Sequence, residues 1–191
     1  MTNLPAPLRD PAPMLERALN EWGGHEDLWI FGYGSLIWRP DFDYAERRPA
    51  KVHGWHRALK MWSRINRGTP ECPGLVFGML SGGSCRGMVF RVDKAHARQV
   101  MINLWQREMI TAVYDPRWLP CRTAQGTGRA LAFTLSRASP SFLPQLDDGI
   151  GLHSRIVRIG EADRLHRAMA QRLAPALRHH LDRQAAVEIG R

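Results

Sequence analysis

An apolar run at residues 28–31 passes directly into the loop 32–35, Gly-Tyr-Gly-Ser, and Pro40 follows soon after. A short continuous apolar run beside glycine is typical of a buried strand. Two glycines with this spacing also occur in dinucleotide-binding folds, which need a third glycine and a helix that continues from the loop. Ile37 occupies the third position and Pro40 blocks the helix, so we expect a buried strand followed by a turn and exclude that fold.

The remaining segments predict many short strands and few helices. A helix is expected to begin near 10–13 and to end at 23–24, and Asp93 is expected to cap a second helix that runs to about Met109. Strands are expected near 52–62, 75–80, 85–92, 113–114 and 130–135, with a hairpin turn at the Ser-Gly-Gly-Ser segment 81–84. Because strands and helices do not alternate regularly, the pattern favours an α+β fold with a small mixed or barrel-like sheet.

Composition narrows the class of protein. Hydrophobic residues make up 44% of the chain, which is enough for a folded core, and no apolar run reaches the ~18 residues of a membrane-spanning helix. The first ten residues lack the basic stretch and apolar run of a secretory signal, so we expect a cytoplasmic protein without a membrane anchor. Three widely spaced cysteines without a Cys-x-x-Cys pair exclude a disulfide framework and a zinc ribbon.

Charge and aromatic content change toward the C-terminus. Residues 1–149 carry 19 basic and 14 acidic side chains, whereas residues 150–191 carry 8 and 4. The segment 143–191 has no aromatic residue and holds half of the eight histidines. The simple interpretation is a solvated pair of C-terminal helices, kinked at Pro175. The arginines form no long run, so charge alone does not favour nucleic acid over a small anion as the ligand.

Few residue patterns in the chain carry chemistry. Neither Ser35 nor Ser84 lies in a Gly-x-Ser-x-Gly nucleophile motif, and no histidine pair has metal-ligand spacing beside an acid, so we expect no metal site. The glycine-flanked loop after the first strand remains. Successive N–H groups in such a turn can form an anion-binding concavity, or the loop can be a plain tight turn.

Glu108 lies where the second helix is expected to bury its apolar face. That face is formed by Ala97, Met101, Leu104 and Trp105. Glu108 falls on the same stripe, at i+4 from Leu104, and a carboxylate there is costly unless it is paired or protonated. It is either half of a buried ion pair with an arginine, for which Arg107 lies too close in sequence, or a general base with a raised pKa.

Residues 29–40, Trp-Ile-Phe-Gly-Tyr-Gly-Ser-Leu-Ile-Trp-Arg-Pro, resemble the signature of ChaC-type glutathione-specific γ-glutamylcyclotransferases. Further blocks resemble that family and follow in its order, at 54–57, 67–71 with 73–74, 85–92 and 104–109. Tyr114 lies six residues after Glu108, as the same resemblance leads one to expect. The resemblance covers roughly residues 28–135 and involves several ordered blocks, which makes it specific.

The resemblance implies a γ-glutamylcyclotransferase-like fold, a small mixed β-barrel flanked by helices. It implies cleavage of glutathione to 5-oxoproline and Cys-Gly by intramolecular attack of the glutamyl α-amine, without metal or cofactor, with Glu108 as general acid and base. Tyr114 would orient Glu108 or the substrate, or serve as an aromatic at the barrel edge. The expected substrate-binding residues are Ile30, Phe31, Gly32, Tyr33, Gly34, Ser35, Leu36 and Tyr114.

The resemblance divides the chain into a helical lead-in at 1–27, a cyclotransferase domain at 28–148 and an atypical Arg/His-rich segment at 149–191. Members of the family usually continue with a glycine-containing turn and a helix that bears a tyrosine, but no tyrosine follows Tyr114 here. We therefore expect the last segment to be divergent or to come from a shifted reading frame. Two alternatives stay open: a cyclotransferase for other γ-glutamyl amines or amino acids, or an inactive relative with an RNA- or partner-binding tail.

Overall fold

The computed structural model describes residues 7–65, 67–70 and 73–144. The segment 149–191, expected to be divergent or frame-shifted, lies outside these residues. Among the described residues, no helix is long and apolar enough to cross a membrane. In chain order the elements are α1 (Ala12–Trp22), β1 (Leu28–Gly32), the 3-10 turn η1 (Ser35–Ile37), β2 (Glu46–Ser63), β3 (Gly74–Val92), α2 (Lys94–Glu108), β4 (Tyr114–Thr123) and β5 (Gly126–Leu135).

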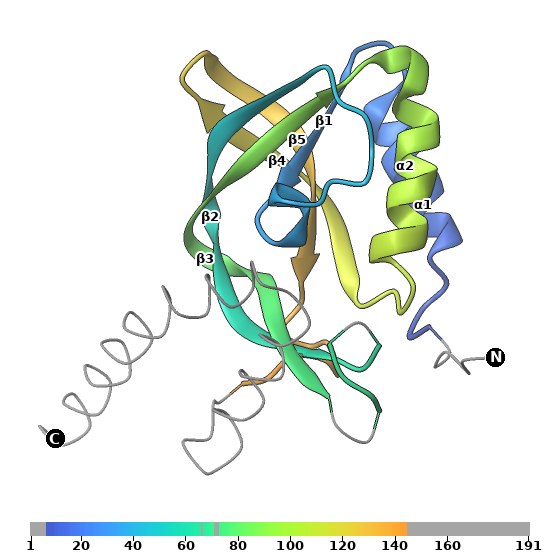
Figure 1. The fold of residues 1–191 in the computed structure, drawn as a ribbon, viewed down its shortest axis with the longest axis vertical. Helices are drawn as coiled ribbons and strands as arrows, with labels where there is room; N and C mark the ends of the chain where they lie inside the picture. The colour runs from blue at the N-terminus through green and yellow to red at the C-terminus, as the bar shows by residue number, and fades with distance from the viewer. Residues whose placement is uncertain (1–6, 66, 71–72, 145–191) are drawn as a thin grey trace, which may run out of the picture. The chain divides into compact units, whose positions relative to one another are not determined.

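The strands close into a barrel with the neighbour order β1-β3-β2-β4-β5 (Figure 1). β1 runs antiparallel to β3, where Phe31 pairs with Val89, and parallel to β5, where Ile30 pairs with Leu131. In a closed barrel each of the described strands has a neighbour on both sides. The mixed strand directions and the flanking helices confirm the expected α+β fold with a small mixed β-barrel.

β3 is one continuous strand and not the hairpin that the Ser-Gly-Gly-Ser segment 81–84 predicts. Gly82 and Gly83 have positive φ angles of 97° and 71°, yet both stay in the sheet beside β2. His56 of β2 faces them, with its Nδ1 2.8 Å from the Gly82 carbonyl oxygen. The hairpin prediction is wrong because positive φ at these glycines is typical of a bulge, which bends a strand without reversing it.

α1 begins and ends as the sequence predicts. The Asp10 carboxylate accepts the Ala12 N–H at 2.9 Å, and prolines lie in the first turn. Gly23 then adopts the left-handed conformation, with φ of 77°, and its N–H donates to the Leu19 carbonyl. A left-handed glycine is the usual end of a helix because it carries no Cβ that would clash.

α1 and α2 lie side by side outside the barrel (Figure 1). The apolar face expected for the second helix is confirmed, because all of its residues are buried together with barrel residues such as Ile30 and Leu131. Trp105 also donates its indole N–H to the Pro11 carbonyl just before α1, at 3.0 Å. This packing sets the position of the C-terminal end of α2, where Glu108 is the last helical residue.

The first turn of α2 is capped from another part of the chain. Asp93 occupies the N-cap position, but its side chain makes no capping hydrogen bond. Asp27, which precedes β1, instead accepts the Lys94 N–H at 3.0 Å and pairs with Arg91 at 2.6 Å. The prediction that the Asp93 side chain caps this helix is wrong, because pairing of β1 with β3 brings Asp27 to the start of the helix.

The described residues of the segment Trp62–Val76 belong to a second unit, which is considered by itself. Within this segment the Arg67 N–H donates to Ser63 Oγ at 3.1 Å. Gly74 lies directly against the Arg67 carbonyl, which a Cβ at that position would overlap. Glycine is therefore required at position 74, because the backbone there lies against the backbone of Arg67.

Candidate active site

The loop that follows β1 turns back immediately, so that Leu36 lies against the last residue of the strand. A Cβ at Gly32, the last residue of β1, would come within 2.9 Å of the Leu36 Cβ, so glycine permits this close turn. η1 follows as a single turn, in which the Ile37 N–H donates to the Gly34 carbonyl at 3.0 Å. The turn expected after the first strand is confirmed, and the N–H groups that open such a turn have no acceptor within it.

The space beside Gly34 is open. A Cβ at this position would meet no atom of the described residues within 4 Å, and its φ of −129° is not left-handed. Glycine here leaves room for another molecule to approach the backbone closely. Open space of this kind fits both interpretations of the loop, the anion-binding concavity and the plain tight turn.

Arg57 of β2 holds the peptide group that precedes Gly34. Its Nη1 donates to the Tyr33 carbonyl at 2.7 Å, and its guanidinium lies 5.5 Å from the ring centroid of Phe77. Peptide bonds in the described residues are trans, so the Gly34 N–H points away from the carbonyl that Arg57 holds. Arg57 therefore sets the direction of the first N–H donor of the loop.

Two tyrosines whose phenols interact, one in the loop and one on β4, belong to this site. Tyr33 is 7% exposed, and its hydroxyl donates to the Phe133 carbonyl on β5 at 2.8 Å. Tyr114, at the start of β4, packs its ring edge-on against Phe133 with centroids 6.2 Å apart, and its phenol interacts with that of Tyr33. Burial, with a smaller contribution from the negative charge of Glu108, raises the pKa of both phenols, so the tyrosines stay neutral beside that carboxylate.

Glu108 is a nearly buried carboxylate at the end of α2. Its side chain is 15% exposed, and burial raises its pKa above the ordinary value, with Arg107 opposing this and Asp41 adding to it. Arg107 Nε lies 3.1 Å from Glu108 Oε1. The expectation that Arg107 lies too close in sequence to pair with Glu108 is wrong, because a long side chain can turn back at the last residues of a helix.

The fold has counterparts in known proteins. A family model described as ChaC-like protein matches residues 28–149. The chain belongs to the ChaC-like family. The match ends at residue 149, the position at which the aromatic-poor, Arg/His-rich segment begins.

This ChaC-like chain is similar to curated proteins named glutathione-specific γ-glutamylcyclotransferase. The protein from Escherichia coli K12 is 35% identical over 116 residues, which cover 60% of this chain and 50% of that protein. The human protein that bears the number 1 is 31% identical over 146 residues, covering 74% of this chain and 65% of its own length. The chain thus spans about half to two thirds of these relatives.

A solved structure supports the fold of the ChaC-like chain independently. The crystal structure of a γ-glutamyl cyclotransferase specific to glutathione from yeast superposes with a TM-score of 0.59 at 18% sequence identity. It covers 72% of this chain and 87% of the yeast chain. At this level of identity the likeness confirms the γ-glutamylcyclotransferase-like barrel that was expected.

The structure brings most of the expected site residues of this ChaC-like chain together, in different ways. Gly32, Gly34 and Ser35 form the loop, and Tyr33 and Tyr114 lie close enough to Glu108 for its charge to act on their phenols. The side chains of three others are buried in the core and leave only backbone atoms to meet a ligand. These three are Ile30, Phe31 and Leu36.

Two arginines at this site were not identified as functional from the sequence. Arg57 and Arg107 each lie in a block that carries the family resemblance, but no local pattern shows which carbonyl or carboxylate they reach. Arg57 contacts a residue far away in the sequence, and Arg107 contacts Glu108 at the end of a helix. Within the described residues, no group of three or more His, Cys, Asp and Glu side chains is placed to hold a metal ion.

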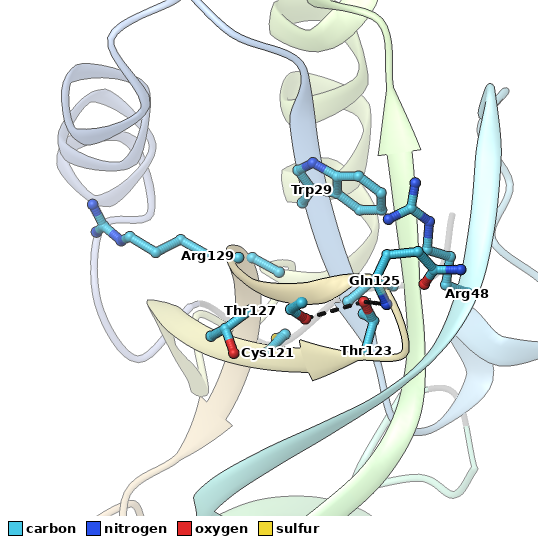
Figure 2. A pocket seen from close by; sticks show the side chains of 11 residues that line it. Trp29, Arg48, Cys121, Thr123, Gln125, Thr127 and Arg129 are labelled. Atoms are coloured by element: carbon cyan, nitrogen blue, oxygen red, sulfur yellow. Dashed lines mark hydrogen bonds between the residues drawn. The ribbon is translucent and has the colours of Figure 1, made fainter.

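A hollow of about 150 Å³ lies at the other end of the barrel of this ChaC-like chain (Figure 2). Its lining includes the starts of β1 and β5 and the end of β4, whereas the loop follows the end of β1 and Glu108 is the last residue of α2. Trp29 and Arg48 stand at one side, with the guanidinium 4.9 Å from the ring centroid, and Arg48 pairs with Glu46. None of the expected site residues lines this hollow.

Proposed function

We propose that this chain cleaves glutathione into 5-oxoproline and Cys-Gly. The observation that carries the proposal is the Glu108 carboxylate, 15% exposed and with a pKa raised by burial, in the same site as the open loop at Gly34. A carboxylate with a raised pKa is a stronger base than an exposed one, and a general base works best when its pKa approaches the working pH. The curated relatives, which carry this activity in their names, support the proposal.

The proposed reaction takes place within the substrate. Glu108 accepts a proton from the glutamyl α-amine, whose nitrogen then attacks the γ-carbonyl carbon and closes a five-membered ring. The bond from that carbon to the cysteine nitrogen breaks, and Glu108 returns the proton to the leaving amine. One carbon–nitrogen bond forms and one breaks with no change in oxidation state, so the proposal needs no redox cofactor.

The loop is proposed to hold the glutamyl half of the substrate. The open space at Gly34 lets the α-carboxylate, or the oxyanion that develops on the γ-carbonyl, approach the N–H groups that open η1. Because the attack is intramolecular, the main task of the protein is to keep the chain folded for ring closure. Such positioning can supply ~7–11 kcal/mol in well-oriented cases.

The neutral tyrosines are proposed to keep Glu108 in place. Their raised pKa values keep both phenols as hydrogen-bond donors near the carboxylate at neutral pH. Tyr33 donates to the Phe133 carbonyl and its phenol also interacts with that of Tyr114, so the two phenols form a linked pair that Tyr114 extends toward the charge of Glu108. This favours a site role for Tyr114 over that of a plain barrel-edge aromatic.

A cytoplasmic location is part of the proposal. Cys85 and Cys121, the cysteines within the described residues, are both buried and free. Reduced buried thiols fit a reducing compartment, where glutathione and thioredoxin systems keep cysteines unpaired.

A cyclotransferase for other γ-glutamyl amines is the second candidate. The loop and Glu108 address the glutamyl half of the substrate, which all γ-glutamyl compounds share. The test incubates the full chain with glutathione, γ-glutamyl-alanine or γ-glutamyl-lysine and quantifies 5-oxoproline and the released amine by chromatography. Release from glutathione alone supports the first proposal, whereas comparable release from all three supports the second.

An inactive binding protein is the outcome that would contradict both. In that case no compound yields 5-oxoproline, and the chain instead binds RNA with an affinity that falls steeply as salt rises. The same preparation should be tested for RNA binding at low and high salt, so that loss of activity through misfolding is told apart from a different function.

A further inference from the structure

Arg107 uses every nitrogen of its guanidinium at the candidate site. Its Nη1 donates to the carbonyls of Arg39 (2.6 Å) and Pro40 (2.9 Å) and to the Asp41 carboxylate (2.9 Å). Its Nη2 donates to Ser35 Oγ at 3.2 Å, and its Nε pairs with Glu108 Oε1 at 3.1 Å. The side chain of Arg107, which is 23% exposed, therefore contacts Ser35 near the start of the segment 33–41, the three residues at the end of this segment, and the Glu108 carboxylate.

The loop conformation depends on these contacts. Asp41 has a φ of 57°, in the left-handed region that residues other than glycine rarely adopt. Its two carboxylate oxygens are held separately, one by Arg39 Nε at 3.0 Å and one by Arg107. Arg39 is mostly exposed, with 73% of its side chain in solvent, so Arg107 provides the more firmly anchored of the two contacts.

The charge of Arg107 also acts on Glu108. The groups around this carboxylate come from several elements. Arg107 on α2 and Asp41 in the loop act on its pKa, whereas its own charge acts on the phenols of Tyr33 and Tyr114. Of these, Arg107 is the one positive charge, and it opposes the rise that burial causes in the pKa of Glu108. Arg107 thus combines a geometric role in the loop with an electrostatic role at the carboxylate.

We propose that Arg107 is the positioning residue that fixes the substrate-binding loop 33–41 against Glu108. The proposal rests on the proposed function, in which this loop holds the glutamyl chain and Glu108 moves the proton. A guanidinium fork suits the role because it donates in several fixed directions at once, which a lysine ammonium on a flexible stem cannot reproduce. Only an arginine is expected to hold both halves of the site together.

The test compares Arg107→Gln and Arg107→Lys with Arg98→Gln, a change of an exposed arginine on the same helix. For each protein, kcat and KM for glutathione are measured across pH, together with thermal unfolding. Arg107→Gln should lower kcat by ~10²-fold, the scale expected for a misplacement of about 1 Å, with a smaller change in KM. Its acidic limb of kcat/KM should also move to higher pH, because Glu108 loses its neighbouring positive charge.

Arg107→Lys separates geometry from charge. The lysine keeps the positive charge, so its acidic limb should stay near that of the wild type, while kcat remains lower by at least about 10-fold because the loop is not held. Arg98→Gln should leave both properties unchanged. Wild-type kcat and an unshifted pH profile in folded Arg107→Gln would overturn the proposal, as would a loss of stability with normal activity per folded molecule.

Amide hydrogen exchange tests the loop without relying on turnover. The N–H groups of Ile37, Trp38 and Arg39 are bonded within the loop, so they should exchange faster in both Arg107 variants than in Arg98→Gln. Unchanged exchange would refute the positioning role. If the wild type releases no 5-oxoproline, the proposed function fails, while the exchange measurement still decides whether Arg107 fixes the loop.

Discussion

Glu108 lies between two opposing effects, since burial disfavours its charge and Arg107 favours it. Glu108→Gln keeps the shape of the side chain and removes the proton acceptor. Turnover of glutathione should fall by at least ~10²-fold, the lower end for a positioned acid–base group. Stability at neutral pH should change little or rise, because Arg107 keeps its bonds to Asp41 and to two carbonyls while a desolvated charge disappears.

Kinetics and thermal unfolding of Glu108→Gln should be measured beside Gln106→Ala, a change at an exposed position in the same turn. In the wild type, activity should rise with pH through the raised pKa of Glu108, and this acidic limb should be missing from any residual activity of the variant. Near wild-type turnover in a stable Glu108→Gln protein would leave the mechanism without its base. A protein that loses stability but keeps its activity would identify Glu108 as a structural ion-pair partner.

Gly34→Val tests whether the open space in the loop is the substrate cradle. The added side chain would enter space that no described residue occupies within 4 Å, and it would block the approach of the substrate to the loop. Activity should be abolished while circular dichroism still shows a folded barrel. Ser35→Ala should cost less if the backbone N–H of Ser35 binds the substrate. Normal turnover by folded Gly34→Val would show that the glutamyl group binds elsewhere.

Among the elements, α2 depends on a cap supplied by Asp27. Asp27→Ala removes the acceptor of the Lys94 N–H and one partner of Arg91, so the unfolding temperature should fall. Asp93→Ala should have a smaller effect, because the Asp93 side chain makes no capping bond and lies 3.5 Å from Arg91. Differential scanning calorimetry measures the unfolding temperatures of both variants and shows which falls further. A larger loss for Asp93→Ala would contradict the assignment of the cap.

β1 and β3 approach each other closely at Gly87. A Cβ there would overlap the Gly32 carbonyl oxygen and come within 2.7 Å of the Phe31 ring. Gly87→Ala should therefore destabilise the barrel by about 1–3 kcal/mol, the usual range for overpacking, measured by urea unfolding. Gly128→Ala on β5 is the matched control, because a Cβ at Gly128 meets nothing within 4 Å. Equal stabilities of the two variants would show that β1 and β3 can move apart enough to admit a methyl group at position 87.

At the scale of the whole molecule, an ion-pair network links the segments around β1, β2 and β3. Hydrogen bonds lower the pKa of Asp27, mainly through Arg91, and of Glu46, mainly through Arg48, from their ordinary values of 3.8 and 4.5. Groups with lowered pKa values stabilise the fold above their unfolded pKa, and this stability is lost as pH falls through the folded pKa. The network should therefore contribute to acid unfolding.

Arg91→Gln tests this contribution, because Arg91 contacts both Asp27 and Glu46. The variant should unfold at a lower temperature than the wild type near pH 7, and the difference should shrink as pH falls below about 4. High salt should also reduce the difference, since these groups are only partly buried. Parallel curves of unfolding temperature against pH would show that the network makes no pH-dependent contribution.

We propose that residues 149–191 derive from a shifted reading frame or a divergent replacement of the family's C-terminal part. The change in composition at this position and the end of the ChaC-like match at residue 149 support the proposal. The other two frames of the coding DNA should then encode a glycine-containing turn and a helix with a tyrosine. Their absence from both frames would contradict the reading-frame origin.

Features that depend on the local order of residues can be predicted from the sequence. Helix α1 ends at a left-handed glycine, α2 buries the face that its spacing predicts, and the turn after β1 follows from its glycines and Pro40. These outcomes rest on preferences of the backbone and on periodic burial, which neighbouring residues along the chain are enough to set. Glu108 was found in the same way, as an acid on an apolar stripe.

Which distant residues meet depends on the folded barrel. The strand order of the barrel, the continuity of β3, the cap supplied by Asp27 and the loop contacts of Arg57 and Arg107 all join segments separated in sequence. Such pairings depend on how the closed sheet brings its strands and helix ends together, and no local pattern encodes that geometry. For this reason the sequence points to the carboxylate, while the fold shows which groups hold it in place and set its pKa.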